Sequence, residues 1–415
     1  MREMKDSGLQ WAGDIPQYWN IAKGKHFMAV LERPVRDDDN VITCFRNGEV
    51  TLRSNRREDG FTVATVEAGY QGIEPGDLVV HGMDGFAGAI GISDSRGKGT
   101  PALNVLSCSE NKKYIMYLLR AMAYTEVFMA LSTGIRVRTC DTNWKKLKSL
   151  DYLIPPADEQ QCIADFLNAK CAEIDALTAD IQTQIDTLEQ YKRSVITETV
   201  TKGLNPNAEM KDSGIQWIGN MPAHWDVIRG KYILRYMQKP VRENDGVITC
   251  FRDGEVTLRS NRREDGFTMS DKEIGYQGID VGDLVVHGMD GFAGSIGISD
   301  SRGKASPVLN VLDTDQCKRY IMYYLRSMAY SDVFLALATG IRVRSCDLRW
   351  NKLAELSYPV PPLDEQNAIV KHIDSVLSKA DAVIADKKAQ LATLDEYKKS
   401  LTFEYVTGKK EVPTS

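Results

Sequence analysis

The hydrophobic positions after residue 155 form a long helical pattern without interruption. Pro155 and Pro156 stop the preceding segment, and the acidic pair 158–159 supplies the negative charge that favours a helix N-terminus. No proline or glycine follows before Gly203, so a helix of about 42 residues would extend roughly 60 Å. Apolar residues recur along it at steps of three, four or seven, which predicts the seam of a coiled coil. The predicted seam consists of Ile174, Leu177, Ile181, Leu188, Tyr191 and Val195.

The same pattern returns at the end of the chain. Pro361 and Pro362 precede a second predicted helix, 206 residues after the first pair of prolines, and Gly408 follows it. Helices of this length are more typical of a spacer or a dimer seam than of an ordinary domain core. The second predicted seam consists of Val376, Ala380, Val383, Leu391, Leu394, Tyr397 and Leu401.

The offset of 206 residues also relates the segments that precede the two helices. Residues 41–62 and 247–268 differ only at Asn47/Asp253, and residues 78–98 and 284–304 differ only at Ala89/Ser295. A repeat of this length is too long for a solenoid, so it indicates the tandem duplication of a domain with its helix. The expected boundaries are 1–157 and 207–363 for the two globular domains, and 158–206 and 364–415 for the two helical segments.

Each globular segment mixes short β-type runs with one longer helical pattern. The runs 41–45, 49–52, 77–80 and 89–93 are rich in β-branched residues and are separated by Gly, Asp and Asn. Apolar residues between Tyr114 and Leu131 recur with helical periodicity. The expected fold class is therefore α+β, with a mixed α/β domain followed by a long helix in each copy.

Length and composition indicate more than one domain with a substantial core. The chain has 415 residues, of which 43% are hydrophobic, and no stretch of eighteen consecutive apolar residues occurs. The N-terminus lacks a basic segment followed by an apolar one, so we expect a cytoplasmic protein with no membrane partner. The eight cysteines form no CxxC pair and are interpreted as buried free thiols in a reducing compartment.

The charges are unevenly distributed, although the net charge is only −5. Residues 112–148 contain eight Lys or Arg against two acids, and residues 318–352 contain seven against two. Residues 158–191, within the first predicted helix, contain eight acids against one base. Local basic clusters decide whether a protein binds a polyanion, so this pattern permits nucleic-acid binding by the globular segments.

The sequence shows no catalytic set and no metal site. The glycines at 85, 88 and 91 form GxxGxxG without a following Lys-Ser/Thr, and a turn between strands is the simpler interpretation. The proline pairs follow Ile154 and Val360, where an amino-methyltransferase signature would have Asn or Asp. His81 and His287 lack partners at metal-ligand spacing, so each is either a DNA contact or a turn histidine with its hydrogen bonds satisfied.

Arginine and asparagine in the strand-and-turn segments suit the reading of DNA bases, because both side chains form paired hydrogen bonds with base edges. Basic residues nearer the helices suit phosphates. The alternative is a solvated basic face, but two nearly identical clusters on a duplicated scaffold favour DNA. The candidate contacts are Arg46, Arg53, Asn55, Arg56, Arg57, His81, Arg96, Lys98, Arg136, Arg138, Lys145 and Lys146, with Arg252, Arg259, Asn261, Arg262, Arg263, His287, Arg302, Lys304, Arg342 and Arg344 in the second copy.

Three repeated features of the chain resemble those of the specificity subunits of type I restriction–modification enzymes. The entry segment Gly-Asp-Ile-Pro…Trp at residues 13–19 recurs at 219–225. Each domain ends in a related segment, GIRVRTCDTNWKKLKSLDYLIPPADEQ in the first copy and GIRVRSCDLRWNKLAELSYPVPPLDEQ in the second. A long helix resembling the family's spacer follows each Pro-Pro…Glu-Gln. The resemblance covers essentially the whole chain.

The resemblance implies two target-recognition domains that each grip one half of a split DNA site. The two spacer helices would pair as an antiparallel coiled coil, set the gap between the half-sites and dock two modification subunits. Those partners would bring S-adenosylmethionine and flip out the target adenine. Where a motor-nuclease subunit joins the complex, it would use ATP and Mg²⁺. The chain itself would hold no cofactor and catalyse no reaction.

The two recognition domains are nearly identical, whereas this family usually carries dissimilar ones. We therefore predict an interrupted palindrome as the DNA site, with one adenine methylated on each strand. The main alternative is a coiled-coil scaffold whose globular domains bind protein. An enzyme on a duplicated fold would need a convergent set of catalytic residues, which the sequence does not show.

Overall fold

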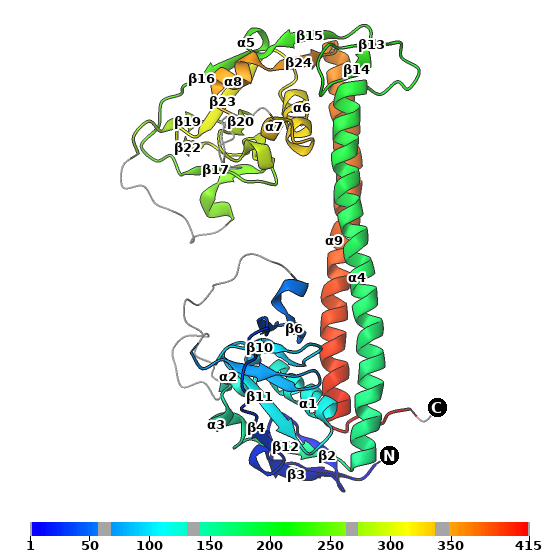
Figure 1. The fold of residues 1–415 in the computed structure, drawn as a ribbon. Helices are drawn as coiled ribbons and strands as arrows, with labels where there is room; N and C mark the ends of the chain where they lie inside the picture. Colours follow the sequence, from blue (N-terminus) through cyan, green and yellow to red (C-terminus); the bar gives the residue numbers. More distant parts are fainter. Residues whose placement is uncertain (1, 57–67, 131–141, 263–272, 337–347, 414–415) are drawn as a thin grey trace. The chain divides into compact units, whose positions relative to one another are not determined.

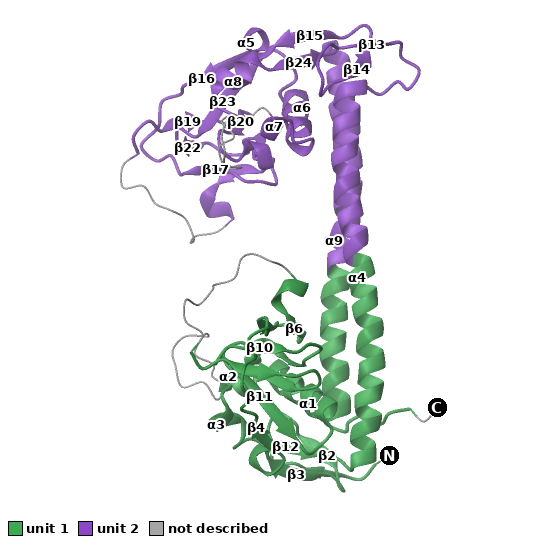
Figure 2. Cartoon of the chain, in the orientation of Figure 1, with its two compact units in different colours: residues 1–181, 389–415 green, residues 182–388 purple. Residues whose placement is uncertain are grey.

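The computed structural model of the chain describes residues 2–56, 68–130, 142–262, 273–336 and 348–413. The chain divides into two compact units, residues 1–181 with 389–415 and residues 182–388 (Figure 2). The division falls inside both long helices, α4 (Ala157–Lys202) and α9 (Leu363–Val406). Each unit therefore contains one globular part and a portion of each long helix.

The first unit is built on a four-stranded antiparallel sheet with the order β4-β11-β8-β9 (Figure 1). Four two-stranded pairs, β1-β2, β3-β12, β5-β6 and β7-β10, accompany it. Its strands are β1 (Met4–Asp6), β2 (Asp14–Pro16), β3 (Asn20–Lys23), β4 (Met28–Val30), β5 (Ile42–Cys44), β6 (Val50–Leu52), β7 (Gln71–Ile73), β8 (Leu78–His81), β9 (Ile90–Ile92), β10 (Gly97–Gly99), β11 (Leu103–Cys108) and β12 (Asp151–Ile154), and its shorter helices are α1 (Lys112–Tyr124), α2 (Val127–Ala130) and α3 (Trp144–Leu147).

The second unit repeats this arrangement, with the sheet order β16-β23-β20-β21. Its strands are β13 (Met210–Asp212), β14 (Asn220–Pro222), β15 (Asp226–Arg229), β16 (Leu234–Met237), β17 (Ile248–Cys250), β18 (Val256–Leu258), β19 (Gln277–Ile279), β20 (Leu284–His287), β21 (Ile296–Ile298), β22 (Gly303–Ala305), β23 (Leu309–Thr314) and β24 (Ser357–Val360), and its shorter helices are α5 (Gly230–Ile233), α6 (Lys318–Tyr330), α7 (Val333–Ala336) and α8 (Trp350–Glu355). These elements confirm the expected α+β class, because each predicted β-type run contains a strand.

The central sheet separates two hydrophobic cores in each unit. Successive side chains of a strand point to opposite faces, so Leu78 and Val80 of β8 join the core with α1, while Val79 joins a smaller core with Cys44 of β5. The second unit divides its cores in the same way along β20. Residues 78–80 are all apolar, as expected for a strand that is buried on both faces.

The single helix predicted between Tyr114 and Leu131 is two helices in the structure. Asn111 begins α1, because its side chain accepts hydrogen bonds from the backbone N–H groups of Lys113 and Tyr114. The chain then turns at Glu126, whose φ of 60° is left-handed, before α2 begins. Apolar periodicity continues across this break, so periodicity alone did not reveal the left-handed residue.

The Glu-Gln pair after each pair of prolines joins the long helix to its globular part. Gln160 is buried, its Nε2 donates to the carbonyl of Pro155 at 2.9 Å, and its Oε1 accepts from the N–H of Asn111 at 3.0 Å. Glu159 accepts a hydrogen bond of 3.0 Å from Nε1 of the fully buried Trp19. Gln366 repeats the glutamine contacts in the second unit. The Pro-Pro…Glu-Gln signature therefore marks the junction between each long helix and its globular part.

The two long helices pack antiparallel, and each unit shows this by itself. In the first unit the rings of Phe166 and Tyr405 lie 4.4 Å apart, and Lys398 Nζ lies 2.5 Å from Asp175 Oδ1. Residue numbers therefore rise along α4 while they fall along α9. In the second unit Lys387 Nζ donates to Gln184 Oε1, and Lys192 Nζ lies 2.6 Å from Asp381 Oδ1, so the numbers again rise along α4 while they fall along α9. The duplication relates the pair Lys192–Asp381 to Lys398–Asp175.

The buried stripe of each long helix differs from the predicted seam. Ile174 and Ile181 are buried as expected, and Leu188, Val195, Leu391 and Leu394 are half-buried. Four predicted seam residues are instead between 45% and 53% exposed, namely Leu177, Tyr191, Val383 and Tyr397. At each of these four places the less exposed side chain is the next residue in sequence, namely Thr178, Lys192, Ile384 and Lys398. The prediction selected the large apolar side chains and overlooked the long lysine stems, which also cover apolar surface.

Candidate nucleic-acid interface

The arginine-rich stretch of the first unit forms the β5-β6 hairpin and the turn after it. Gly48 lies in the hairpin with φ +85°, and an added Cβ would overlap the guanidinium of Arg120. Arg120 donates to the carbonyls of Ile90 at 2.8 Å and Gly48 at 2.9 Å, so it fixes the hairpin to the sheet. The second unit has the same glycine geometry at Gly254. The hairpin is thus a rigid platform for the candidate side chains.

Four arginines of the two hairpins present partly exposed side chains. Arg46 is 69% exposed and pairs with Asp84 at 2.8 Å, and Arg252 is 66% exposed and pairs with Asp290 at 3.0 Å. Arg56 lies over the ring of Phe45, with its Cζ 4.5 Å from the ring centroid, and Arg262 lies over Phe251 at 4.3 Å. Exposed ion pairs of this kind are weak, so these arginines can exchange a carboxylate for DNA at small cost.

The residues after the hairpin hold each other by local hydrogen bonds. Arg53 Nε donates to Thr43 Oγ1 at 3.4 Å, and Asn55 Nδ2 donates to Thr51 Oγ1 at 2.8 Å. The equivalent bonds in the second unit join Arg259 to Thr249 at 3.3 Å and Asn261 to Thr257 at 2.8 Å. The hydrogen bonds place these side chains beside the strand ends, where their remaining donors are oriented by the turn.

Arg96 and Arg302 hold the fold together and are not free phosphate contacts. Arg96 is 20% exposed, binds the buried carboxylate of Asp39 at 2.7 Å and also pairs with Glu74. Hydrogen bonding from the Arg96 guanidinium lowers the pKa of Asp39 to about 2. Arg302 binds Asp245 at 2.7 Å in the same way. These ion pairs argue against the expected DNA contacts of Arg96 and Arg302, because both guanidinium groups are already bound to buried carboxylates of their own unit.

Each of the two candidate histidines stabilises the turn that follows it by accepting backbone hydrogen bonds. His81 Nδ1 accepts hydrogen bonds from the backbone N–H groups of Met83 at 3.2 Å and Asp84 at 3.1 Å, and His287 does the same. Burial lowers the pKa of His81 and of His287, which favours the neutral ring that this acceptor role needs. Of the two alternatives, the geometry supports the turn histidine.

The remaining candidates are lysines and residues outside the described ranges. Lys145 and Lys146 lie on α3, whose first turn is capped by the side chain of Asn143. Lys98 lies on β10, and Lys304 on β22 pairs with Glu273 at 2.7 Å. Six candidates lie outside the described residues, namely Arg57, Arg136, Arg138, Arg263, Arg342 and Arg344.

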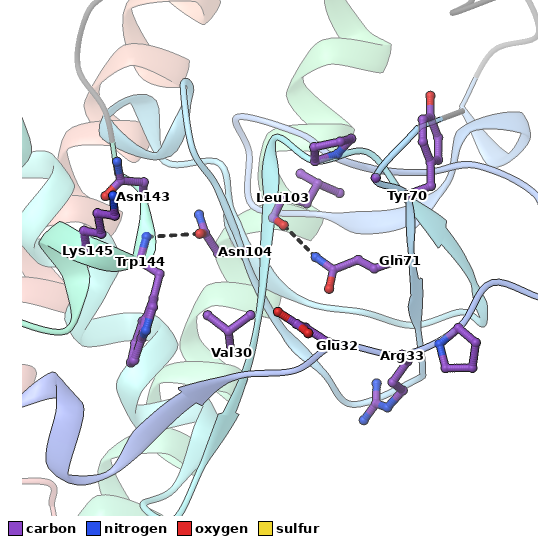
Figure 3. Close-up of a pocket in the computed structure, with 13 residues that line it drawn as sticks. Val30, Glu32, Arg33, Tyr70, Gln71, Leu103, Asn104, Asn143, Trp144 and Lys145 are labelled. Carbon is purple, nitrogen blue, oxygen red and sulfur yellow. Dashed lines mark hydrogen bonds between the residues drawn. The ribbon is translucent and has the colours of Figure 1, made fainter. Parts of the chain in front are cut away.

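A cavity of about 750 Å³ lies in the first unit beside α3, and sequence reasoning did not find it. Figure 3 shows Trp144 and Tyr70 at two ends of the cavity, with Val30, Glu32 and Asn104 between them. These residues are spread over more than a hundred positions of the chain. The only sequence signal was the tryptophan at 144, which recurs at 350 in the second copy.

The described residues contain no cluster of three or more potential metal ligands. No helix among these residues is long and apolar enough to cross a membrane. The described cysteines are free thiols, of which Cys44, Cys171 and Cys250 are buried while Cys162 is exposed. The expectation of buried thiols is therefore wrong for Cys162.

Comparisons with known proteins agree on one family, although no protein-family model matches the chain. The putative type I restriction enzyme MjaX specificity subunit of Methanocaldococcus jannaschii is 24% identical, over 97% of this chain and 96% of the relative. The StySPI specificity subunit of Salmonella potsdam is 19% identical, over 96% and 90%. A solved chain from a study of type I R-M complex assembly matches with a TM-score of 0.67 and 12% identity, over 95% of this chain and 99% of that one. Over nearly its whole length, the chain is similar to type I restriction enzyme specificity subunits, and it has the fold of the solved chain from the type I R-M study.

Proposed function

We propose that this chain is the DNA-specificity subunit of a type I restriction–modification complex. The observation that carries the proposal is similarity to specificity subunits over nearly the whole chain, on a scaffold that presents the same arginine hairpin twice. Exposed Arg46 and Arg252, together with Arg56 and Arg262, form two corresponding sets of base-reading side chains. The chain acts in the cytoplasm, and the chemistry belongs to its partner subunits.

The long helices act as the spacer between the two half-sites and dock two modification subunits. Two observations support this role: the antiparallel packing of α4 and α9 in each unit, and the repetition of the Lys398–Asp175 pair as Lys192–Asp381. A two-fold axis relates equivalent antiparallel helices, and DNA has two-fold axes of its own. Two equal readers related in this way recognise the same bases on opposite strands. The proposed site is therefore an interrupted palindrome.

Binding to duplex DNA tests the function directly. The full chain, with its modification subunits, should bind DNA with an affinity that falls steeply between about 50 and 200 mM salt, because each neutralised phosphate releases counterions. Single-molecule sequencing of DNA from cells that express the complex should then reveal one methylated adenine on each strand of an interrupted palindrome. A scaffold protein would show neither the salt-dependent affinity nor the methylated motif. Two unrelated half-sites would refute the palindrome while leaving the function intact.

A further inference from the structure

The cavity beside α3 is open in the first unit. Its walls include the side chains of Val30, Glu32, Gln71, Trp144 and Lys145 (Figure 3). A volume of about 750 Å³ lies within the range of small-molecule and cofactor sites. Trp144 is half-buried, so part of its indole remains accessible. The cavity therefore offers an aromatic surface to a ligand of moderate size.

The second unit shows what fits against this tryptophan. Tyr236 occupies the position equivalent to Val30, and its ring stacks on Trp350, with ring centroids 6.0 Å apart and an interplanar angle of 27°. Valine carries no ring, so among the described residues of the first unit no aromatic group stacks on the corresponding surface of Trp144. The duplication has thus supplied an internal example of a planar ring held against this indole.

The polar residues equivalent to those of the cavity are more deeply buried in the second unit, which indicates that the corresponding space is filled there. Gln71 and Asn104 are half-buried in the first unit, whereas Gln277 and Asn310, their equivalents, are 6% and 4% exposed. The buried Oε1 of Gln277 has no hydrogen-bond partner, although its Nε2 donates to the carbonyl of Leu309 at 2.9 Å. Gln71 makes the same 2.9 Å bond to Leu103 and turns its amide oxygen away from that carbonyl, toward the open space (Figure 3).

The charges of the cavity also differ between the units. Glu32 and Lys145 are replaced by Gln238 and Asn351 in the second unit. Among the described residues, neither Glu32 nor Lys145 has an ion-pair partner, whereas Arg33 is neutralised by Asp77. The carboxylate of Glu32 and the oxygen of Gln71 can accept N–H groups, and the ammonium of Lys145 can donate to an anion. A ligand that suits these groups has a planar ring, N–H groups along one edge of the ring and an adjacent anion. A nucleotide has all three features.

We propose that this cavity is a nucleotide pocket of the first unit, which stacks one base on Trp144, accepts its N–H edge through Glu32 and Gln71, and binds its phosphate with Lys145. The base comes either from bound DNA, displaced from its stack, or from a free nucleotide. The duplex source rests on the proposed DNA-binding function, and the free source does not. A base taken from DNA adds one contact on one side of an otherwise symmetric site.

The second unit supplies the test variants, because it already carries each substituted residue in the same fold. Val30→Tyr places the stacked tyrosine of the second unit over Trp144, and a separate double variant, Glu32→Gln with Lys145→Asn, removes both unpaired charges. Val281→Tyr is the matched control, since it adds the same ring at a position that is 66% exposed. Tyr236→Val is the reciprocal variant and should open the second unit. Thermal unfolding of every full-length variant establishes that it is folded.

Two probes distinguish the sources of the base. In the first arm, 2-aminopurine replaces single bases across the methylated motif and its flanks, and its fluorescence is recorded with the complex. In the second arm, each of the four deoxynucleoside monophosphates is titrated against the tryptophan fluorescence of the full chain. Stacking of one base on an aromatic side chain corresponds to roughly a 5- to 150-fold difference in affinity, so V30Y and the charge variant should each weaken binding at least about fivefold.

A 2-aminopurine signal at one position that V30Y abolishes and V281Y retains supports a base from DNA. Quenching by a mononucleotide that V30Y abolishes, without a duplex signal, supports a free nucleotide. Wild-type, V30Y and charge-variant proteins that respond alike in both arms overturn the pocket. Wild-type protein that binds no duplex at all overturns the proposed function instead, and the mononucleotide arm then decides the pocket alone.

Discussion

Arg262 Nη1 lies 2.7 Å from Asp253 Oδ2 in the second unit, and it is also 3.3 Å from the carboxylate of Glu255. The equivalent Arg56 in the first unit donates to the amide oxygen of Asn47 at 3.4 Å and, within the described part of the chain, pairs with a single carboxylate, that of Glu49, at 3.3 Å. This is the one difference between otherwise identical 22-residue blocks. The second hairpin therefore carries one more negative charge beside its arginine than the first.

This difference predicts unequal affinity of the two units for DNA. Asp253→Asn removes a carboxylate that competes with phosphate for Arg262, and it should strengthen DNA binding about two- to fivefold at low salt, as expected for an exposed pair. Asn47→Asp should weaken binding by a similar factor. Fluorescence anisotropy of a labelled duplex measures both, and Asp38→Asn is a control that removes an exposed carboxylate and introduces the asparagine found at 244. Equal effects of D253N and D38N would show that only total charge matters.

Arg96 should affect stability much more than DNA binding. Arg96→Ala leaves the buried carboxylate of Asp39 without its guanidinium, and this should cost on the order of 2–4 kcal/mol of unfolding free energy. Urea unfolding measures the cost, and Arg46→Ala is the control because its exposed ion pair contributes about 1 kcal/mol or less. For protein that remains folded, R96A should leave the salt dependence of DNA affinity unchanged. A smaller salt slope in R96A would return Arg96 to the list of phosphate contacts.

The same ion pairs predict destabilisation in acid. The pKa of Asp39 is lowered to about 2 by Arg96, and the pKa of Asp280 is lowered to about 2 by Lys239 and Arg302. A carboxylate with a lowered pKa contributes stability that is fully present above its unfolded pKa of about 3.9 and disappears as pH falls through the folded value. Unfolding free energy should therefore decrease between about pH 5 and pH 2, and R96A should show a shallower decrease. Identical pH profiles for R96A and wild type would contradict this account.

The sequence predicted what depends on local pattern and missed what depends on distant partners. The duplication, the long helices and the strand runs follow from periodicity and from the prolines and glycines that bound them. Arg96 was assigned to DNA for its positive charge, and the ion pair was not foreseen because Asp39 lies 57 residues earlier in the chain. The cavity was missed because Val30 and Trp144 meet only after the sheet forms.

The seam shows the same limit within a single helix. Leu177 and Tyr191 were selected by hydrophobicity, but Lys192 and Lys398 lie in the buried stripe, where each lysine stem packs while its ammonium reaches a carboxylate on the other helix. A hydrophobicity scale gives lysine no weight at a seam position. Only the antiparallel register identifies Asp381 and Asp175 as the partners that make a lysine acceptable there.

Mutations should distinguish the residues that recognise bases from the residues that bind phosphates. Arg53→Ala with Arg259→Ala removes a guanidinium held beside the strand end in each unit, and it should relax sequence preference. Lys145→Ala with Lys146→Ala removes two ammonium groups of α3, and it should weaken binding to all sequences and reduce the salt slope by roughly one to two. Competition between cognate and random duplexes at several salt concentrations measures both effects. A uniform loss from both pairs would show that these residues have been sorted wrongly.

The long helices make a prediction about spacing, because their buried stripe advances in steps of three and four residues in both copies. Seven residues inserted after Ile181 in α4 and after Lys388 in α9 preserve this stripe and add roughly 10 Å of helix. If the helices set the distance between half-sites, the methylated motif should keep its half-sites and gain a gap of about three base pairs, at 3.4 Å each. Insertion of two residues at the same points is the control, since at 3.6 residues per turn it rotates the stripe by about 200°, to the opposite side of the helix, and should destabilise the helix pair. Methylome sequencing of cells that carry each variant gives the gap directly. A folded and active seven-residue variant that methylates the original motif would exclude the helices as the spacer.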